Sequence, residues 1–120
     1  TEQLFHGGND PENRETLWPN YSNTTDMYSF LAKVIQHRKS VALYKEPQVQ
    51  RYAASNFYAF TRGDTLVAVT NQGTGSTVNY TLTYLPETWK AGDNVCDILT
   101  GDCIQVTSGG LAIGLQDGLP

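Results

Sequence analysis

The 120-residue sequence lacks the features that define several large protein classes. No apolar run approaches the ~20 residues of a membrane-spanning helix, so we expect no membrane anchor. The chain has 8 basic and 12 acidic residues, which gives a net charge of −4. The basic residues are mostly scattered along the sequence. No phosphate-binding surface is indicated, and nucleic acid is not an expected partner. The chain is also too short for a complete barrel of eight strands and eight helices, which needs ~250 residues.

The start of the sequence has neither an initiator methionine nor a leader-like segment. The first residue is Thr1, and the basic and apolar stretches of a secretory signal do not follow it. We therefore expect the natural N-terminus to lie upstream of Thr1.

Cysteine is scarce, with Cys96 and Cys103 the two in the chain. Their spacing suits a disulfide that staples a hairpin across residues 100–102, although two buried thiols are an alternative. A bond closing so short a loop would contribute about 2–3 kcal/mol on the chain-entropy model. A redox role is not expected, because the spacing is not Cys-x-x-Cys and neither cysteine has a neighbouring Lys or His.

Three Asn-x-Ser/Thr sequons begin at Asn20, Asn23 and Asn79. Sequons also arise by chance, but this density predicts glycosylated surface asparagines in a secreted protein. Together with a disulfide, they favour an oxidising, extracellular location.

The first third of the chain predicts a loop followed by one helix. Residues 1–21 are rich in Gly, Asn and Pro, which favours a loop. From Thr24 to Lys39, apolar residues recur every three or four positions, as on one face of a helix. Thr24 is the expected N-cap, and basic residues in the last turns suit the negative end of the helix dipole.

Beyond Pro47 the pattern becomes that of short antiparallel strands. Residues 57–61 and 65–70 flank a Gly-containing connection and predict a hairpin. Further extended runs are expected at residues 77–83, 94–99, 103–106 and 111–113. Strands at this spacing indicate an antiparallel sandwich.

Short motifs along the chain share a likeness to one enzyme family. Residues 7–15 read Gly-Gly-Asn-Asp-Pro-Glu-Asn-Arg-Glu, residues 35–39 read Ile-Gln-His-Arg-Lys, and residues 58–63 read Tyr-Ala-Phe-Thr-Arg-Gly. In this order they resemble the loop after the last barrel strand, the final barrel helix and the opening sandwich strands of alpha-amylases. Residues 1–3 resemble the end of that last strand.

The resemblance implies an α+β chain with two parts. Residues 1–42 would be the end of a (β/α)8 catalytic barrel, with its last strand, substrate loop and final helix. Residues 43–120 would be an antiparallel β-sandwich domain that lacks its last strand. The exposed sheet edge would then be covered by a further part of the protein or by a partner.

The resemblance also implies a binding role for Asp10 and Arg14, which would contact glucose units of an α-glucan or starch. A carboxylate accepts hydrogen bonds from sugar hydroxyls, and a guanidinium donates several. The alternative is that the two side chains merely pair and order the loop. Trp18 could stack on a sugar, but we expect it to pack the loop against the helix.

The implied parent enzyme hydrolyses α-1,4-glucosidic bonds by a retaining mechanism, which needs two carboxyl groups about 5 Å apart. In the family these lie on earlier barrel strands, so we assign no catalytic residue, metal or cofactor to this chain. Calcium is expected in the parent, and the rest of the barrel is the expected protein partner. The isolated chain is expected neither to hydrolyse starch nor to bind calcium tightly.

Other classes of function remain open from the sequence. A related transglycosidase would share these motifs. A non-catalytic carbohydrate-binding module would need an exposed aromatic platform, for which Tyr44, Tyr52, Tyr84 and Trp89 are candidates, although such residues more often pack in the core. A purely structural extracellular sandwich would leave Asp10 and Arg14 without a role.

Overall fold

The computed structural model describes residues 3–118, and the chain divides between Val41 and Ala42 into two compact units. The first unit contains a long loop with a short 3₁₀ turn, η1 (Trp18–Asn20), and one helix, α1 (Asp26–Ser40). The strand end expected at residues 1–3 lies mostly outside the described residues, and Gln3 itself is in a turn.

The helix α1 begins one residue later than expected. Thr25, not Thr24, is the N-cap, because the Thr25 Oγ1 accepts a hydrogen bond of 3.0 Å from the backbone N–H of Tyr28. The Thr24 hydroxyl instead lies 3.0 Å from the hydroxyl of Ser22. The expected charge pattern is present, with Asp26 in the first turn and basic residues in the last.

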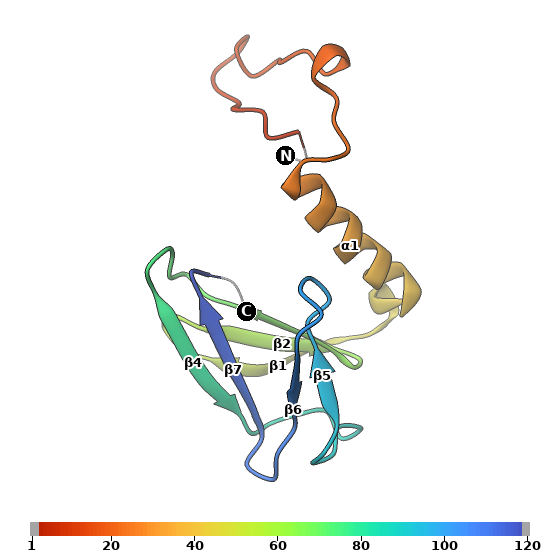
Figure 1. The fold of residues 1–120 in the computed structure, drawn as a ribbon, viewed down its shortest axis with the longest axis vertical. Coiled ribbons are helices and arrows are strands. Elements are labelled where there is room, and N and C mark those ends of the chain that lie inside the picture. Colours follow the sequence, from red (N-terminus) through yellow and green to blue (C-terminus); the bar gives the residue numbers. More distant parts are fainter. Residues whose placement is uncertain (1–2, 119–120) are drawn as a thin grey trace. The chain divides into compact units, whose positions relative to one another are not determined.

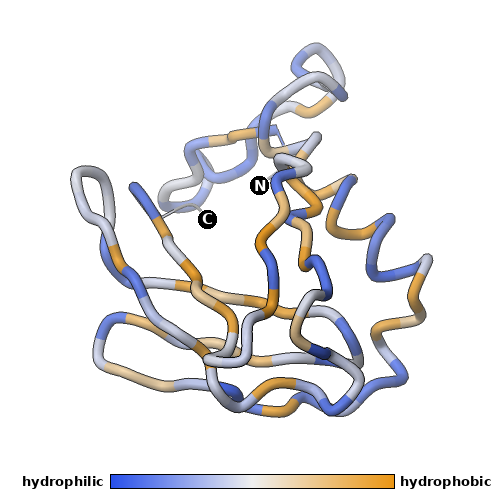
Figure 2. The backbone as a smooth tube through the Cα atoms, turned by 60° about the horizontal axis from the view of Figure 1, so that its bottom comes forward, coloured by the Kyte–Doolittle hydropathy of each residue, from blue (hydrophilic) through white to orange (hydrophobic). Residues whose placement is uncertain are grey.

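No residue of α1 is buried. Hydrophobic and hydrophilic positions alternate along it (Figure 2), and on its apolar side Phe30 and Ile35 remain 43% and 48% exposed. Within this unit, the helix therefore has an amphipathic pattern without a core to bury it in.

The second unit opens with a short 3₁₀ turn, η2 (Leu43–Lys45), and continues as antiparallel strands, as the sequence predicts. The strands are β1 (Gln48–Ala53), β2 (Tyr58–Arg62), β3 (Thr65–Val69), β4 (Thr77–Leu82), β5 (Asn94–Cys96), β6 (Cys103–Gln105) and β7 (Leu111–Gln116). They form a three-stranded sheet β1-β2-β3 and the pairs β4-β7 and β5-β6. In Figure 1, β1 and β2 run across the view, whereas β4 to β7 run down it.

The core lies between the three-stranded sheet and the β4-β7 pair. Burial along β7 alternates strictly, with Leu111, Ile113 and Leu115 inside, as expected for a strand with one solvated face. The buried cluster draws on both layers, and its members are Phe57, Ala59, Val78, Leu82, Val106, Leu111, Ile113 and Leu115. This packing is that of a small β-sandwich.

The strand β5 ends three residues earlier than expected. The Asp97 carboxylate accepts hydrogen bonds from the backbone N–H groups of Leu99 and Thr100, at 2.9 and 3.2 Å. Because these N–H groups bond to a side chain, they cannot continue the ladder, and the chain turns. The strand β7 is longer than expected, since Gly114 pairs with Asn79 and does not interrupt it.

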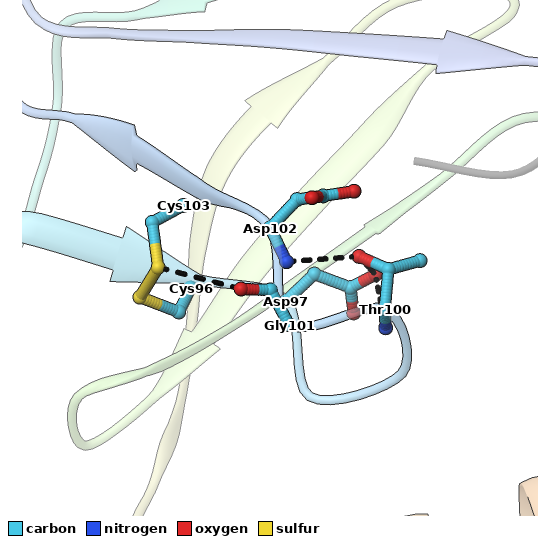
Figure 3. Close-up of a disulfide and its surroundings, with 6 residues drawn as sticks. All are labelled: Cys96, Asp97, Thr100, Gly101, Asp102 and Cys103. Carbon is cyan, nitrogen blue, oxygen red and sulfur yellow. Dashed lines mark hydrogen bonds between the residues drawn. A yellow bond between two sulfur atoms is a disulfide. The ribbon is translucent and has the colours of Figure 1, made fainter.

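The hairpin β5-β6 carries the expected disulfide. Cys96 and Cys103 are register partners, and their sulfur atoms are 2.02 Å apart. Figure 3 shows the bond at the base of the turn, where the Thr100 hydroxyl donates to Asp97 over 2.9 Å. None of the residues of these two strands is buried, so the covalent link holds a hairpin at the edge of the core.

Candidate functional site

The loop of the first unit is closed by a reciprocal pair of hydrogen bonds. The Gln3 amide donates to the carbonyl of Ser22 over 2.8 Å and accepts from the backbone N–H of Ser22 over 2.6 Å. A side-chain amide has both donor and acceptor, so it pairs with the backbone as a strand would. These two bonds fix both ends of the segment that contains Asp10 and Arg14.

Asp10 and Arg14 form an ion pair within this loop. The Nε of Arg14 donates to an Asp10 carboxylate oxygen over 2.7 Å. The backbone between them is turned by bonds from the N–H of Asn13 to the carbonyl of Asn9 and from that of Arg14 to that of Pro11, both 3.0 Å. Pairing, the alternative raised by the four-residue spacing, is therefore present.

The pair is exposed, with 76% of the Arg14 side chain and 63% of the Asp10 side chain accessible. Ion pairs in such positions contribute about 0–1 kcal/mol to stability, so the backbone turns and the Gln3 contacts account for more of the loop's order. A guanidinium has four N–H donors besides Nε, and a carboxylate has a second oxygen. The arrangement can therefore present donors and an acceptor together to a hydroxyl-rich ligand.

The backbone of the neighbouring glycines is also held. The N–H of Gly7 donates to the Glu15 carboxylate over 3.1 Å. Sequence reasoning identified neither Gln3 nor Glu15 as organisers of the loop. Contacts across 19 and 8 residues leave no periodic signal that could have revealed them.

Trp18 does not pack the loop against the helix, so that expectation is wrong. It begins η1 and is 91% exposed. The turn is held instead by polar contacts, from the Asn20 N–H to the carbonyl of Leu17 and from the Asn20 side chain to that of Thr16. An indole exposed on the same loop as Asp10 and Arg14 is available for stacking on a ligand.

A tyrosine follows this turn and contacts the helix. Tyr21 is 60% exposed, and its hydrogen bond with the Tyr28 side chain raises the pKa of the Tyr21 phenol above its ordinary value.

The three sequon asparagines all lie on the surface. Asn20 uses its side-chain N–H in the 2.8 Å bond to Thr16. Asn23 is exposed just before α1, and Asn79 is exposed in the middle of β4.

Of the four aromatic residues considered for a carbohydrate-binding platform, Tyr44 and Tyr84 are exposed, whereas the other two are partly buried. Tyr52 and Trp89 pack against the core. Tyr84 is 60% exposed, and the guanidinium of Arg51 lies 4.6 Å from its ring centre. The same Arg51 donates through Nε to the buried Thr61 hydroxyl over 2.8 Å. The register shift between Gln50 and Tyr52 leaves Arg51 free for this structural role, which the sequence pattern did not reveal.

No helix in residues 3–118 has the length and apolar character needed to cross a bilayer. No three His, Cys, Asp or Glu side chains in the same range gather in a way that could hold a metal ion.

Comparison with known proteins shows how much of the chain is similar to alpha-amylases. Alpha-amylase 1 of Schwanniomyces occidentalis is 29% identical, over 99% of this chain and 25% of its own length. This chain matches a C-terminal part of an alpha-amylase. A cyclomaltodextrin glucanotransferase of Bacillus sp. (strain 38-2) is 31% identical over 93% of the chain and 16% of its own length. No protein-family model matches the chain.

The fold agrees with the alpha-amylase likeness. A solved alpha-amylase from Malbranchea cinnamomea superposes with a TM-score of 0.83 and 26% identity, over 98% of this chain and 26% of that one. The antiparallel sheets and single helix are thus similar to the C-terminal domain of an alpha-amylase. The chain spans about a quarter of these alpha-amylases or less.

Proposed function

We propose that this chain is the C-terminal part of a secreted alpha-amylase that hydrolyses α-1,4-glucosidic bonds of starch or glycogen with retention. The observation that carries the proposal is the likeness to an alpha-amylase along 99% of the chain. The catalytic carboxyl groups, about 5 Å apart in retaining enzymes, would lie outside these residues. Calcium, which the likeness to alpha-amylases leads us to expect in the parent enzyme, would likewise be held by other parts of it.

In this proposal residues 1–42 end the catalytic barrel and residues 43–120 form the sandwich domain. The state of α1 supports the assignment, because none of its residues is buried although it has an apolar side. Exposed apolar helix faces usually mark a contact surface. The rest of the barrel would cover Phe30 and Ile35.

Asp10 and Arg14 would contact the glucan. Loops after the strands of such a barrel line its active-site face, and both side chains are exposed in a loop whose ends are pinned. Bound sugar hydroxyls would donate to the Asp10 carboxylate and accept from the Arg14 guanidinium. Hydrogen bonds to charged groups contribute about 1.5–3 kcal/mol each.

The test uses the full-length enzyme. Arg14→Ala and Asp10→Asn are each expected to lower kcat/KM on maltooligosaccharides by on the order of tenfold to a hundredfold. The matched control is Glu12→Gln, which removes an exposed charge from the same loop and is expected to leave kcat/KM nearly unchanged. Equal effects of the three substitutions would show that loop charge in general, and not sugar contact, matters.

A related transglycosidase is the second candidate, favoured by the 31% identity with a cyclomaltodextrin glucanotransferase. The same full-length protein, incubated with starch, separates the two. Linear maltooligosaccharides with new reducing ends would indicate a hydrolase, whereas cyclic dextrins without new reducing ends would indicate the transferase.

A further inference from the structure

The outer face of the β4-β7 pair carries no charged side chain. The two strands pair along six positions, from Thr77 opposite Gln116 to Leu82 opposite Leu111, without a register shift. The exposed residues of this face are Thr77, Asn79, Thr81, Ala112, Gly114 and Gln116. The face is therefore regular, small in its side chains and electrically neutral.

Regular, uncharged strands are prone to associate with other strands or sheets. Proteins commonly prevent this with charged residues, prolines or bulges. The strand β1 has two of these devices, a bulge and Arg51. Neither β4 nor β7 contains a charged residue, a proline or a bulge, so the two strands have none of these three devices.

Asn79 lies at the centre of this face. Its cross-strand partner is Gly114, and its Oδ1 is 2.9 Å from where a Cβ on Gly114 would stand. The side chain thus leans across the neighbouring strand, into space that only glycine leaves open. Beside it is a shallow, open hollow of about 190 Å³ lined by residues 79–81 and 112–114.

Asn79 also begins the sequon Asn79-Tyr80-Thr81, with Thr81 exposed on the same face. We propose that an N-linked glycan on Asn79 covers the outer face of β4-β7 and prevents its association with other strands. Asn20 is the poorer candidate for such a role, since its side-chain N–H is bonded to Thr16.

The modification is a transfer from a lipid-diphosphate-linked oligosaccharide. The asparagine Nδ2 forms a bond to the sugar C1 and loses one proton, while the bond from C1 to the diphosphate oxygen breaks and the lipid diphosphate leaves. The attached chain is bulky and strongly solvated. The inference rests on the secretion included in the proposed function, which the Cys96–Cys103 disulfide supports.

The first measurement is site occupancy. The full-length protein is secreted from a eukaryotic host that glycosylates proteins, and is then digested with a protease. The mass of the peptide containing Asn79 is measured by mass spectrometry before and after treatment with an N-glycosidase. We expect most of this peptide to lose the mass of a glycan. Thr81→Ser keeps the sequon and should keep the glycan, whereas Thr81→Val should lose it. An unmodified Asn79 in the wild-type protein would overturn the proposal.

The second measurement is association. The glycan-free variants Asn79→Gln and Thr81→Val are expected to aggregate severalfold faster than wild type on mild heating, followed by light scattering. Asn79→Lys also lacks the glycan but restores a charge to the face, so it should aggregate at about the wild-type rate. Wild-type aggregation rates for Asn79→Gln, or no rescue by lysine, would contradict the protective role.

Starch hydrolysis by the same samples keeps this test separate from the proposed function. If the glycan protects the face but the protein does not act on starch, the proposed function alone fails. If starch is hydrolysed but Asn79 is unmodified, the present inference alone fails.

Discussion

The two units of the chain are ordered by different interactions. In the second unit, Leu82, Leu111 and Leu115 are almost completely buried between two layers of strands. In the described part of the first unit, residues 3–41, no side chain is buried, and the loop is held by hydrogen bonds such as those of Gln3 and Ser22. The hydrophobic effect is the main favourable term in folding. We therefore expect the second unit to be stable through its own core and the first to depend on additional apolar surface.

The largest expected effect tests whether the core belongs to the second unit alone. Leu82→Ala should lower the free energy of unfolding of the 120-residue chain by about 2–5 kcal/mol, because it leaves a cavity at a position with no exposed area. Ile35→Ala removes similar atoms from an exposed helix position and should change this free energy by about 0.5 kcal/mol or less. Urea unfolding followed by fluorescence measures both. Comparable losses would mean that α1 is part of the same core.

The same substitution, Ile35→Ala, is also informative in the full-length enzyme. If the barrel covers α1, Ile35→Ala should lower the free energy of unfolding of the full-length enzyme by about 2–4 kcal/mol, as truncations of buried side chains do. The loss would thus be larger in the full-length enzyme than in the 120-residue chain. An unchanged, small effect in the full-length enzyme would remove the support that α1 gives to the barrel assignment.

A smaller effect is expected at the β5-β6 hairpin, which resembles the first unit in having no buried residue in its strands. Replacing Cys96 and Cys103 together by Ala should lower the free energy of unfolding by about 2–3 kcal/mol on the chain-entropy model. Local opening of the hairpin should also become easier, so hydrogen exchange should accelerate more in β5 and β6 than in β4 and β7. Equal acceleration in all four strands would show that the hairpin and the core unfold as one.

The smallest effect concerns the start of α1. Thr25→Ala removes the N-cap acceptor of the Tyr28 N–H and should cost about 1 kcal/mol of helix stability. It is measured as a loss of helical circular dichroism on heating. Thr24→Ala, which leaves that acceptor in place, is the matched control and should have little effect. A larger loss of helix stability in Thr24→Ala than in Thr25→Ala would show that Thr24 is the N-cap.

The sequence predicted those features that depend on local periodicity. The helix was expected at residues 24–39 and lies at Asp26–Ser40, and the hairpin expected at 57–61 and 65–70 is formed by β2 and β3. Alternation and turn residues suffice for such elements. The expectation that Thr24 is the N-cap was wrong. Adjacent threonines give the same sequence pattern, and only the backbone geometry distinguishes them.

Features that depend on distant or side-chain contacts were not predictable in this way. The length of β5 was misjudged because the Asp97 carboxylate captures backbone N–H groups that a strand would use. Trp18 was expected to pack because aromatic residues usually do, yet the polar contacts of its turn leave it exposed. At the candidate site, the spacing of Asp10 and Arg14 indicated that they could pair, and their role with a sugar stays a prediction.

The contacts between Gln3 and Ser22 bring the entry and exit of the loop to one point. Residues inserted or deleted between them would change how far the loop reaches, while the first turn of α1 would keep its place. Loop length is thereby uncoupled from helix register. Among relatives, this gives ligand preference a way to diverge through small insertions and deletions, without any cost to the helix that follows.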